Sequence, residues 1–309
     1  MVKLTVVATL YKSSTYITEF YQRIKQTSES ITHDFEIVFV NDGSPDQSLE
    51  IVLSLRESDN RIKVIDLSRN FGHHNAIMTG LSFAKGEYVF LIDVDLEEPP
   101  ELLELFWREM LINKEVDVLY GVQMKRKGGV FEKITGGIFY GVYNYLSNDK
   151  IIHNTATCRL MKSDYVKALV SHQEREVFLA GLFAITGYNQ KPISVIKHST
   201  SPTTYSFNKK LALMINAITS FSNKPLEFIF NIGSLISSIS FGFVIFLLLR
   251  QLLFGISMVG WTSIVASIWL MGGMIIFCLG IVGIYISKIF TEVKQRPYTI
   301  VKNTYGQEE

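Results

Sequence analysis

The feature that most constrains this chain is an apolar stretch near its C-terminal end, residues 226–287. Its 62 residues include only two charged side chains, Glu227 and Arg250. The uncharged runs 229–249 and 261–287 are each long enough to cross a hydrocarbon core of about 30 Å as a helix, because an α-helix rises about 1.5 Å per residue. Hiding two such helices inside a soluble domain would require a much larger chain. The pattern therefore predicts a transmembrane helical hairpin and excludes a wholly soluble protein.

Positive charge lies on both sides of this hairpin but not in the short link between its helices. Because the cytoplasmic flanks of membrane helices are enriched in Lys and Arg, we expect a multi-pass protein of the cell (inner) membrane with both termini in the cytoplasm. Residues 207–225 place apolar side chains at helical spacing between lysines, which predicts an amphipathic helix on the lipid bilayer, with a plain linker as the alternative. The flanking cations are Lys209, Lys210 and Lys224 before the hairpin and Lys288, Lys294, Arg296 and Lys302 after it.

The sequence thus divides into four parts. We expect a cytoplasmic domain over residues 1–206, the juxtamembrane helix over 207–225, the two-helix hairpin over 226–290 and a cytoplasmic tail over 291–309. The 30 basic and 29 acidic residues give a net charge of +1, which does not favour a nucleic-acid partner. Cys158 and Cys278 form no C-x-x-C pattern, so neither a disulfide nor a zinc site is expected. Small residues in the second span allow close helix packing and leave a homo-oligomer open: Gly272, Gly273, Gly280 and Gly283.

Strand-like and helix-like segments alternate through the first 121 residues. Their apolar, β-branched runs are typical of strands buried on both faces, and alternation with helices predicts a doubly wound, mostly parallel α/β sheet. In such sheets, ligands bind beyond the carboxyl ends of the strands. Polar clusters fall at these ends: Thr9 to Tyr11, Asn41-Asp42, Arg69-Asn70 and Asp93-Val94-Asp95. Strands are expected at 4–10, 35–40, 62–67, 87–92 and 116–121, with helices at 14–28, 44–56, 73–84 and 101–112.

Three carboxylates, Asp93, Asp95 and Glu97, alternate directly after the fourth expected strand. Side chains at alternating positions of an extended segment point the same way, and like charges held that close favour a bound cation. Oxygen ligands suit Mg²⁺ or Mn²⁺, which usually bridge substrate phosphates; a solvated turn is the alternative. The chain lacks G-x-G-x-x-G after its first strand and G-x-x-x-x-G-K-[ST] anywhere, which disfavours dinucleotide oxidoreduction and P-loop phosphoryl transfer.

Four motifs follow one another along the chain, and their order is characteristic of one family: Asn41-Asp42-Gly43-Ser44, Arg69-Asn70-Phe71-Gly72, Asp93-Val94-Asp95-Leu96-Glu97-Glu98-Pro99 and Glu292-Val293-Lys294-Gln295-Arg296-Pro297. Together with the two-span tail they resemble the family 2 glycosyltransferases that act on polyprenyl phosphates, namely bactoprenol-phosphate glucosyltransferases and dolichol-phosphate mannose synthases. The resemblance implies a GT-A fold. It also implies an inverting, metal-dependent transfer from a UDP-sugar, glucose or a related hexose, to polyprenyl (undecaprenyl) phosphate at the inner leaflet. The product would be a lipid-linked monosaccharide for surface glycan modification.

The same resemblance assigns the donor site residue by residue. Thr9 and Tyr11 stand where the family's first loop holds the nucleotide, and Asp42 where it contacts the base. Asp93, with Val94, would hold the ribose side. Asp93, Asp95 and Glu97 would bind Mg²⁺ or Mn²⁺ with the diphosphate. Arg69 would orient the donor, with a structural salt bridge as an equal alternative. Arg126 lies in Lys125-Arg126-Lys127, a basic loop that relatives place near the active site, with a solvated charge run as the alternative. His73 and His74 are interpreted as surface or donor-contacting histidines.

Arg159 and Arg175 are the candidates for the acceptor phosphate, because a guanidinium fork matches phosphate oxygens. Three departures from the family pattern stand out: Thr9-Leu10-Tyr11-Lys12-Ser13 replaces P-x-Y-N-E, Thr157 replaces an Asp proposed as a base, and Ser201-Pro202-Thr203-Thr204-Tyr205 replaces G-x-S-K-Y. A phosphate monoester is mostly dianionic at neutral pH, since its second pKa is about 6, and needs no deprotonation. Catalysis by Asp95, Arg159 and Arg175 is therefore expected despite Thr157.

The sequence leaves two other functions open and disfavours two more. A catalytically inactive, membrane-anchored protein that still binds nucleotide sugar is an alternative, motivated by Thr157 and the altered first loop. A polyprenyl-phosphate mannose synthase that uses GDP-mannose is another. A processive polysaccharide synthase is disfavoured because the chain lacks Q-x-x-R-W and further spans. A transporter is disfavoured because two uncharged spans offer no polar pathway.

Overall fold

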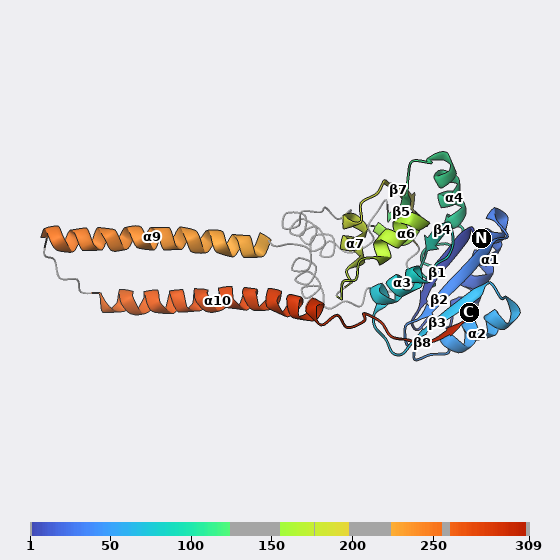
Figure 1. The fold of residues 1–309 in the computed structure, drawn as a ribbon, viewed down its shortest axis with the longest axis horizontal. Coiled ribbons are helices and arrows are strands. Elements are labelled where there is room, and N and C mark those ends of the chain that lie inside the picture. The colour runs from blue at the N-terminus through green and yellow to red at the C-terminus, as the bar shows by residue number, and fades with distance from the viewer. Residues whose placement is uncertain (1, 124–154, 176, 198–223, 255–259, 307–309) are drawn as a thin grey trace. The chain divides into compact units, whose positions relative to one another are not determined.

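The computed structural model describes residues 2–123, 155–175, 177–197, 224–254 and 260–306. The chain forms two compact units. The first comprises Met1–Gly141, Asp149–Phe207 and Arg296–Glu309, and the second comprises Val142–Asn148 and Asn208–Gln295. The elements of the first unit (Figure 1) are β1 (Leu4–Leu10), α1 (Ile17–Ile31), β2 (Phe35–Asn41), α2 (Ser48–Ser58), β3 (Ile62–Leu67), α3 (His73–Ser82), β4 (Tyr88–Leu91), α4 (Leu102–Ile112), β5 (Val118–Gln123), β6 (Thr155–Lys162), α6 (Ser163–Val170), α7 (Leu179–Ile185), β7 (Gln190–Val195) and β8 (Val301–Tyr305).

A single sheet of eight strands organises the first unit, in the order β7-β5-β6-β4-β1-β2-β3-β8 among the described residues. The strands from the first hundred residues are parallel, as the alternating pattern predicts: β1 pairs with β2 and β4, and β2 with β3. β6 runs antiparallel to both β4 and β5. The sheet is therefore a mixed α/β sheet, less uniformly parallel than the sequence indicates. The carboxyl ends of β1, β2 and β4 lie at one edge, where a ligand site is expected.

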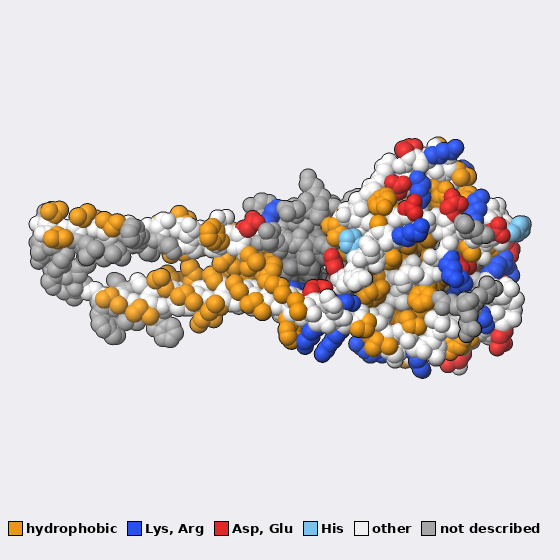
Figure 2. Space-filling model, in the orientation of Figure 1, with side chains coloured by type: hydrophobic (Ala, Val, Ile, Leu, Met, Phe, Trp, Pro, Cys, Tyr) orange, Lys and Arg blue, Asp and Glu red, His pale blue; other side chains and the backbone are white. Residues whose placement is uncertain are grey.

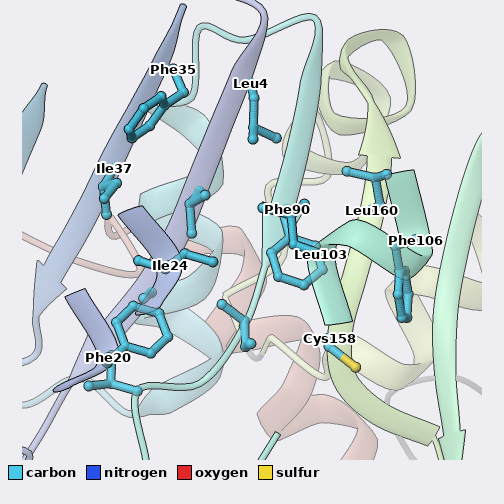
Figure 3. Packing of buried hydrophobic residues seen from close by; sticks show 14 of the residues in the cluster. Leu4, Phe20, Ile24, Phe35, Ile37, Phe90, Leu103, Phe106, Cys158 and Leu160 are labelled. Carbon is cyan, nitrogen blue, oxygen red and sulfur yellow. The ribbon is translucent and has the colours of Figure 1, made fainter. Parts of the chain in front are cut away.

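Both faces of the parallel strands are buried, which explains why their sequences do not alternate with polar residues. On one face, the ring of Phe20 in α1 lies edge-on to that of Phe39 in β2, with centres 6.1 Å apart, and Phe90 of β4 lies 5.8 Å from Phe106 of α4. Figure 3 shows Phe20, Phe90, Phe106 and other buried residues of the same cluster. On the other face, α3 packs so closely that a Cβ at Gly80 would lie 2.6 Å from Val7 Cγ1 and 2.8 Å from Val40 Cγ2. The second helix layer therefore depends on Gly80, and it fixes α3 against the sheet.

The C-terminal residues return to the sheet as its edge strand, β8. β8 runs antiparallel to β3, with Val64 opposite Tyr305. Ser68 donates its backbone N–H to the Ile300 carbonyl at 2.9 Å, and the hydroxyls of Thr79 and Thr299 lie 2.8 Å apart. The sequence predicts only a tail for this segment, because an edge strand with exposed Lys302, Asn303 and Thr304 shows little hydrophobic pattern.

The second unit contains two long helices, α9 (Lys224–Phe254) and α10 (Trp261–Val293). They include both uncharged runs expected to form helices. Among the described residues, one segment, Leu270–Val293, is long and apolar enough to cross a membrane, and none of it is buried within the protein. Figure 2 shows apolar side chains along α10. Most of the expected juxtamembrane helix, up to residue 223, lies outside the described residues.

Candidate functional site

A small cavity opens where the parallel strands end. Its volume is about 150 Å³, and it lies between the segments that follow β1, β2 and β3. Three of its lining residues, Thr9, Tyr11 and Asp42, were predicted from the sequence to bind the donor nucleotide. The structure brings them together as their positions at strand ends require. The full lining is Thr9, Tyr11, Asp42, Asn70, Gly72 and His73.

Asp42 holds the segment after β3 against the end of β2. Its buried carboxylate accepts hydrogen bonds from the backbone N–H groups of Phe71, at 2.7 Å, and Gly72, at 3.0 Å. Burial raises the pKa of Asp42, while the two amide hydrogen bonds act in the opposite direction. The next residue, Gly43, has a φ of +57°, and a Cβ there would lie 2.4 Å from the carbonyl carbon of Arg69. The motifs around Asp42 and Arg69 are therefore one structural unit that only glycine allows.

Arg69 is beside the cavity and does not line it. Its guanidinium lies 4.1 Å from the centre of the Phe71 ring, and Nη1 donates to the Asn70 carbonyl at 3.0 Å. These contacts stabilise the same segment that Asp42 holds. A salt bridge, one of the two interpretations of Arg69, is not among the ion pairs of the described residues.

The acidic segment follows β4, and its carboxylates have different partners. Asp93 Oδ1 lies 3.4 Å from His73 Nε2. Asp95 Oδ1 accepts the backbone N–H of Glu97 at 3.0 Å, and Glu97 Oε2 pairs with Lys197 Nζ at 2.9 Å. Burial raises the pKa of Asp95, and the charges of Asp93 and Glu97 raise it further. The side chain of Val94, which is also predicted to belong to the donor site, is buried in the hydrophobic core, and its part in donor binding stays a prediction.

A metal ion at this site would depend mainly on Asp93 and Asp95. No group of three or more His, Cys, Asp or Glu side chains gathers within metal-binding reach in the described part of the chain. Two carboxylates are nevertheless enough for Mg²⁺ when substrate phosphates and water complete its shell. The mutual repulsion that raises the pKa of Asp95 would be relieved by a cation. Glu97 Oε2 is paired with Lys197, whose positive charge would oppose that of a metal ion beside it.

Glu98 connects the acidic segment to β6, a role that sequence reasoning missed. Its fully buried carboxylate accepts the backbone N–H groups of Thr157, at 3.1 Å, and Cys158, at 2.9 Å. Burial raises the pKa of Glu98, and the nearby charge of Asp93 adds to this. The only sequence signal was its place in the acidic motif. Thr157 takes part through its backbone, so the family's missing Asp is not replaced by the Thr157 side chain in this contact.

Arg159 is a buried cation one strand away from the acidic segment. In β6 its backbone lies opposite Leu91 of β4 on one side and Tyr120 of β5 on the other, and only 4% of the residue is exposed. Its guanidinium carbon lies 3.5 Å from the centre of the Phe183 ring, and among the described residues its Nε has no hydrogen-bond partner. Burial lowers the pKa of Arg159 to about 10. A buried charge without a paired anion is costly, so this position suits an anionic ligand.

Arg175 lies between α6 and α7. Its charge lowers the pKa of Tyr298, which burial raises overall, so Arg175 lies near the segment that follows α10. That Arg175 and Arg159 meet at one phosphate stays a prediction. Arg126, with the whole basic loop Lys125-Arg126-Lys127, lies outside the described residues, as does the motif at Ser201 to Tyr205.

Two consecutive histidines at the start of α3 have contacts that the sequence did not reveal. His73 Nδ1 lies 3.1 Å from Thr9 Oγ1, so this side chain joins the ends of β1 and β4. His74 Nδ1 lies 3.2 Å from the Val177 carbonyl oxygen, and its ring lies 6.4 Å from that of Phe178. Burial lowers the pKa of His74. A hydrophobic first turn would have marked a buried helix end; a histidine pair gives no such signal.

Comparison with known proteins places this site in a family context. The model of Glycosyl transferase family 2 matches residues 5–170. A protein of Mycobacterium tuberculosis named among putative glycosyltransferases is 49% identical over 99% of this chain and 89% of its own length. The bactoprenol glucosyl transferase derived from prophage SfII in Shigella flexneri is 32% identical over 98% of both chains. The crystal structure of glucosyl-3-phosphoglycerate synthase from M. tuberculosis shares the fold, with a TM-score of 0.50, 14% identity and coverage of 71% of this chain and 79% of that one.

Proposed function

Because this chain belongs to glycosyl transferase family 2 and is a glycosyltransferase, we propose that it transfers a hexose from a UDP-sugar to polyprenyl phosphate at the inner leaflet of the cell membrane. The observation that carries the acceptor assignment is Arg159, a buried guanidinium on the strand beside the acidic segment that forms no ion pair within the described part of the chain and whose Nε lacks a hydrogen-bond partner there. Relatives named bactoprenol glucosyl transferases match over nearly the full chain, which supports a polyprenyl phosphate as that anion.

The donor is assigned to the cavity beyond β1 and β2. Tyr11 offers a half-exposed ring to the nucleoside and Asp42 an acceptor oxygen to the base. Thr9 in the same cavity, and Asp93 beside His73, are assigned to the ribose and diphosphate side. Glucose or a related hexose on UDP agrees with the glucosyl transferases among the relatives. Use of GDP-mannose is the alternative that the test below separates.

Asp93 and Asp95 are the residues that would hold Mg²⁺ or Mn²⁺, with Glu97 as a third ligand if Lys197 releases it. When bound, such an ion supplies positive charge that stabilises the leaving diphosphate. The side chains themselves keep the acidic segment in place: Asp95 closes a turn on the Glu97 amide, and Glu98 fixes the segment to β6. The donor is thus held at a defined distance from Arg159.

Arg159 and Arg175 would bind the acceptor phosphate. One phosphate oxygen attacks C1 of the sugar from the face opposite the diphosphate, so the new C1–O bond forms as the bond to the diphosphate breaks. The electron pair leaves with UDP, and the anomeric centre is inverted. The attacking oxygen already carries negative charge at neutral pH, so Thr157 does not have to act as a base. The product, a lipid-linked monosaccharide, would serve surface glycan modification.

Chain connectivity supports a membrane hairpin. The chain leaves the first compact unit before α9 and re-enters it at Arg296, where β8 joins the sheet. If the first unit stays on one side of the membrane, helices α9 and α10 must together cross the bilayer an even number of times. Since Leu270–Val293 in α10 has the length and composition of one membrane span, α9 is assigned as the other span. The flanking lysines then put the catalytic unit and both termini in the cytoplasm.

The test is a transfer assay on the full chain in detergent. Undecaprenyl phosphate is incubated with Mg²⁺ or Mn²⁺ and one labelled donor at a time: UDP-glucose, UDP-galactose, UDP-N-acetylglucosamine or GDP-mannose. The proposal expects label from one UDP-hexose in the organic-extractable fraction, and none after chelation. Transfer from GDP-mannose alone would assign the mannose synthase. Nucleotide binding without transfer from any donor would assign the inactive anchor.

Asp95→Asn tests the metal assignment in the same assay. Removing one charged ligand is expected to lower transfer at least about 100-fold while leaving the thermal midpoint of the protein unchanged. The matched control is Asp164→Asn, because the Asp164 side chain is 81% exposed and pairs only with nearby Lys167 among the ion pairs of the described residues. Wild-type transfer by Asp95→Asn would remove the metal from the proposal.

A further inference from the structure

The first two residues of α3, His73 and His74, contact two different parts of the candidate site. Neighbouring side chains in an α-helix point about 100° apart around its axis, so one turn can contact separate elements. His73 touches Thr9 and Asp93, at the ends of β1 and β4, and it lines the nucleotide cavity. His74 points to Val177 and Phe178, in the segment between α6 and α7 that also carries Arg175.

The two histidines use their ring nitrogens in different ways. His73 Nε2 lies 3.4 Å from Asp93 Oδ1, and its Nδ1 lies 3.1 Å from Thr9 Oγ1, so its two nitrogens face two residues of the cavity side. A carbonyl can only accept, so His74 donates from Nδ1 to the Val177 carbonyl. The two histidines therefore have distinct side-chain mimics: Gln for a contact at Nε2 and Asn for one at Nδ1.

Helix α3 is fixed in place by several contacts, as a helix must be if its first turn is to position two parts of the site. Gly72, directly before the helix, donates its N–H to Asp42 at 3.0 Å. Further along, Gly80 is in close contact with Val7 and Val40, and the hydroxyl of Thr79 meets that of Thr299. Three separate contacts, to the cavity, the sheet and the C-terminal segment, thus fix the helix that carries both histidines.

We propose that His73 and His74 are positioning residues for different substrates: His73 orients Thr9 and Asp93 for the nucleotide-sugar donor, and His74 holds Val177 and Phe178, close in sequence to Arg175, for the phosphate acceptor. One turn of α3 then sets the separation between the two substrates. The assignment rests on the proposed function for the identity of the ligands. It goes beyond that proposal in giving each histidine a separate effect on binding.

Side-chain mimics test each contact. His73→Ala removes the contacts to Thr9 and Asp93, whereas His73→Gln keeps a donor at the place of Nε2. His74→Phe keeps the ring but leaves the Val177 carbonyl without its donor, whereas His74→Asn keeps a donor at the place of Nδ1. Loss of one or two hydrogen bonds at a binding site corresponds to about a tenfold loss in affinity. The conservative variants are expected within about threefold of wild type.

The experiment measures binding of UDP by titration calorimetry, binding of undecaprenyl phosphate by its quenching of tryptophan fluorescence, and both KM values. His73→Ala is expected to weaken UDP binding and raise the donor KM about tenfold, with acceptor values unchanged. His74→Phe is expected to do the reverse. Equal shifts in both ligands, no shift in either, or failure of Gln and Asn to rescue would overturn the inference. Because binding is measured directly, a wild-type protein that transfers no sugar would refute the proposed function and still leave this division of roles decided.

Discussion

Replacing Arg159 by Met should make the free protein more stable while removing its ability to use the acceptor. In the free protein Arg159 is 4% exposed, and its Nε finds no hydrogen-bond partner in the parts of the chain that the structure describes. Burial lowers its pKa from 12.5 to about 10, which corresponds to a cost of roughly 3 kcal/mol for keeping the charge in place. Arg159 thus resembles other functional residues that are retained at the expense of stability.

The expected gain is smaller than this cost, because the charge also has a favourable contact. The Phe183 ring, 3.5 Å away, returns about 1–2 kcal/mol through its attraction for the cation. Met has a similar length and fills the same space with apolar atoms. A net stabilisation of about 1–2 kcal/mol follows, and for a domain of this size it raises the thermal midpoint by about 2–8 °C.

The assay compares thermal midpoints in detergent with transfer to undecaprenyl phosphate. The matched control is Arg61→Met, the same substitution at a paired arginine far from the cavity. Arg61 hydrogen-bonds to Asp59 through Nε, at 2.9 Å, and Nη2, at 2.7 Å, and also to Glu29. Its loss leaves the nearly buried Asp59 with fewer partners, so the control should lose about 2–3 kcal/mol and keep wild-type transfer.

The decisive result is a thermal midpoint that rises in Arg159→Met and falls in Arg61→Met. Arg159→Met should also lose at least about 100-fold in transfer, while undecaprenyl phosphate should stabilise the wild type and not the variant. A fall in the midpoint of Arg159→Met comparable to that of Arg61→Met would mean that Arg159 has a structural anion partner, and the acceptor argument would fail. Retained transfer would refute it as well.

Three further outcomes are expected. Asp42→Asn replaces one of two accepting oxygens by a donor, so either Phe71 or Gly72 loses its acceptor and UDP affinity falls about 10–100-fold by calorimetry; unchanged affinity would count against the pocket. Thr157→Ala should keep transfer within about threefold, since Glu98 binds the backbone of Thr157; a hundredfold loss would give its hydroxyl a role. Hydrogen bonds from Arg61 lower the pKa of Asp59. That stabilisation is present above the unfolded pKa of about 3.9 and is lost as the pH falls below it, so the wild-type midpoint should drop more steeply from pH 5 to 3 than that of Asp59→Asn. Parallel curves would contradict this.

Several features could be predicted from the sequence because their signals are local. Strands β1 to β4 and helices α9 and α10 follow from apolar runs and their periodicity. Thr9, Tyr11 and Asp42 meet at one cavity because parallel strands bring their carboxyl ends to one edge. The four motifs in order indicated the family, which the match over residues 5–170 confirms.

Other features depend on contacts between residues far apart in the chain, and no local pattern encodes them. The ion pair of Glu97 with Lys197 and the hydrogen bonds of Glu98 to β6 join segments about 60 to 100 residues apart. Val94 shows the same limit: a strand end can face a ligand or the core, and its burial is decided by what packs above it.

By itself, then, the sequence determined the helical tail, the alternation of strands and helices in the parallel part of the sheet, and the family. Each of these depends on residue spacing within one segment or on motifs in sequence order. Only the tertiary structure decided that the C-terminal residues form the edge strand β8, that Arg159 is buried with its Nε unpartnered among the described residues, and that His73 and His74 face different parts of the site. The physical reason is that burial and pairing are properties of the packed surroundings, and these are built from segments that the chain brings together only on folding.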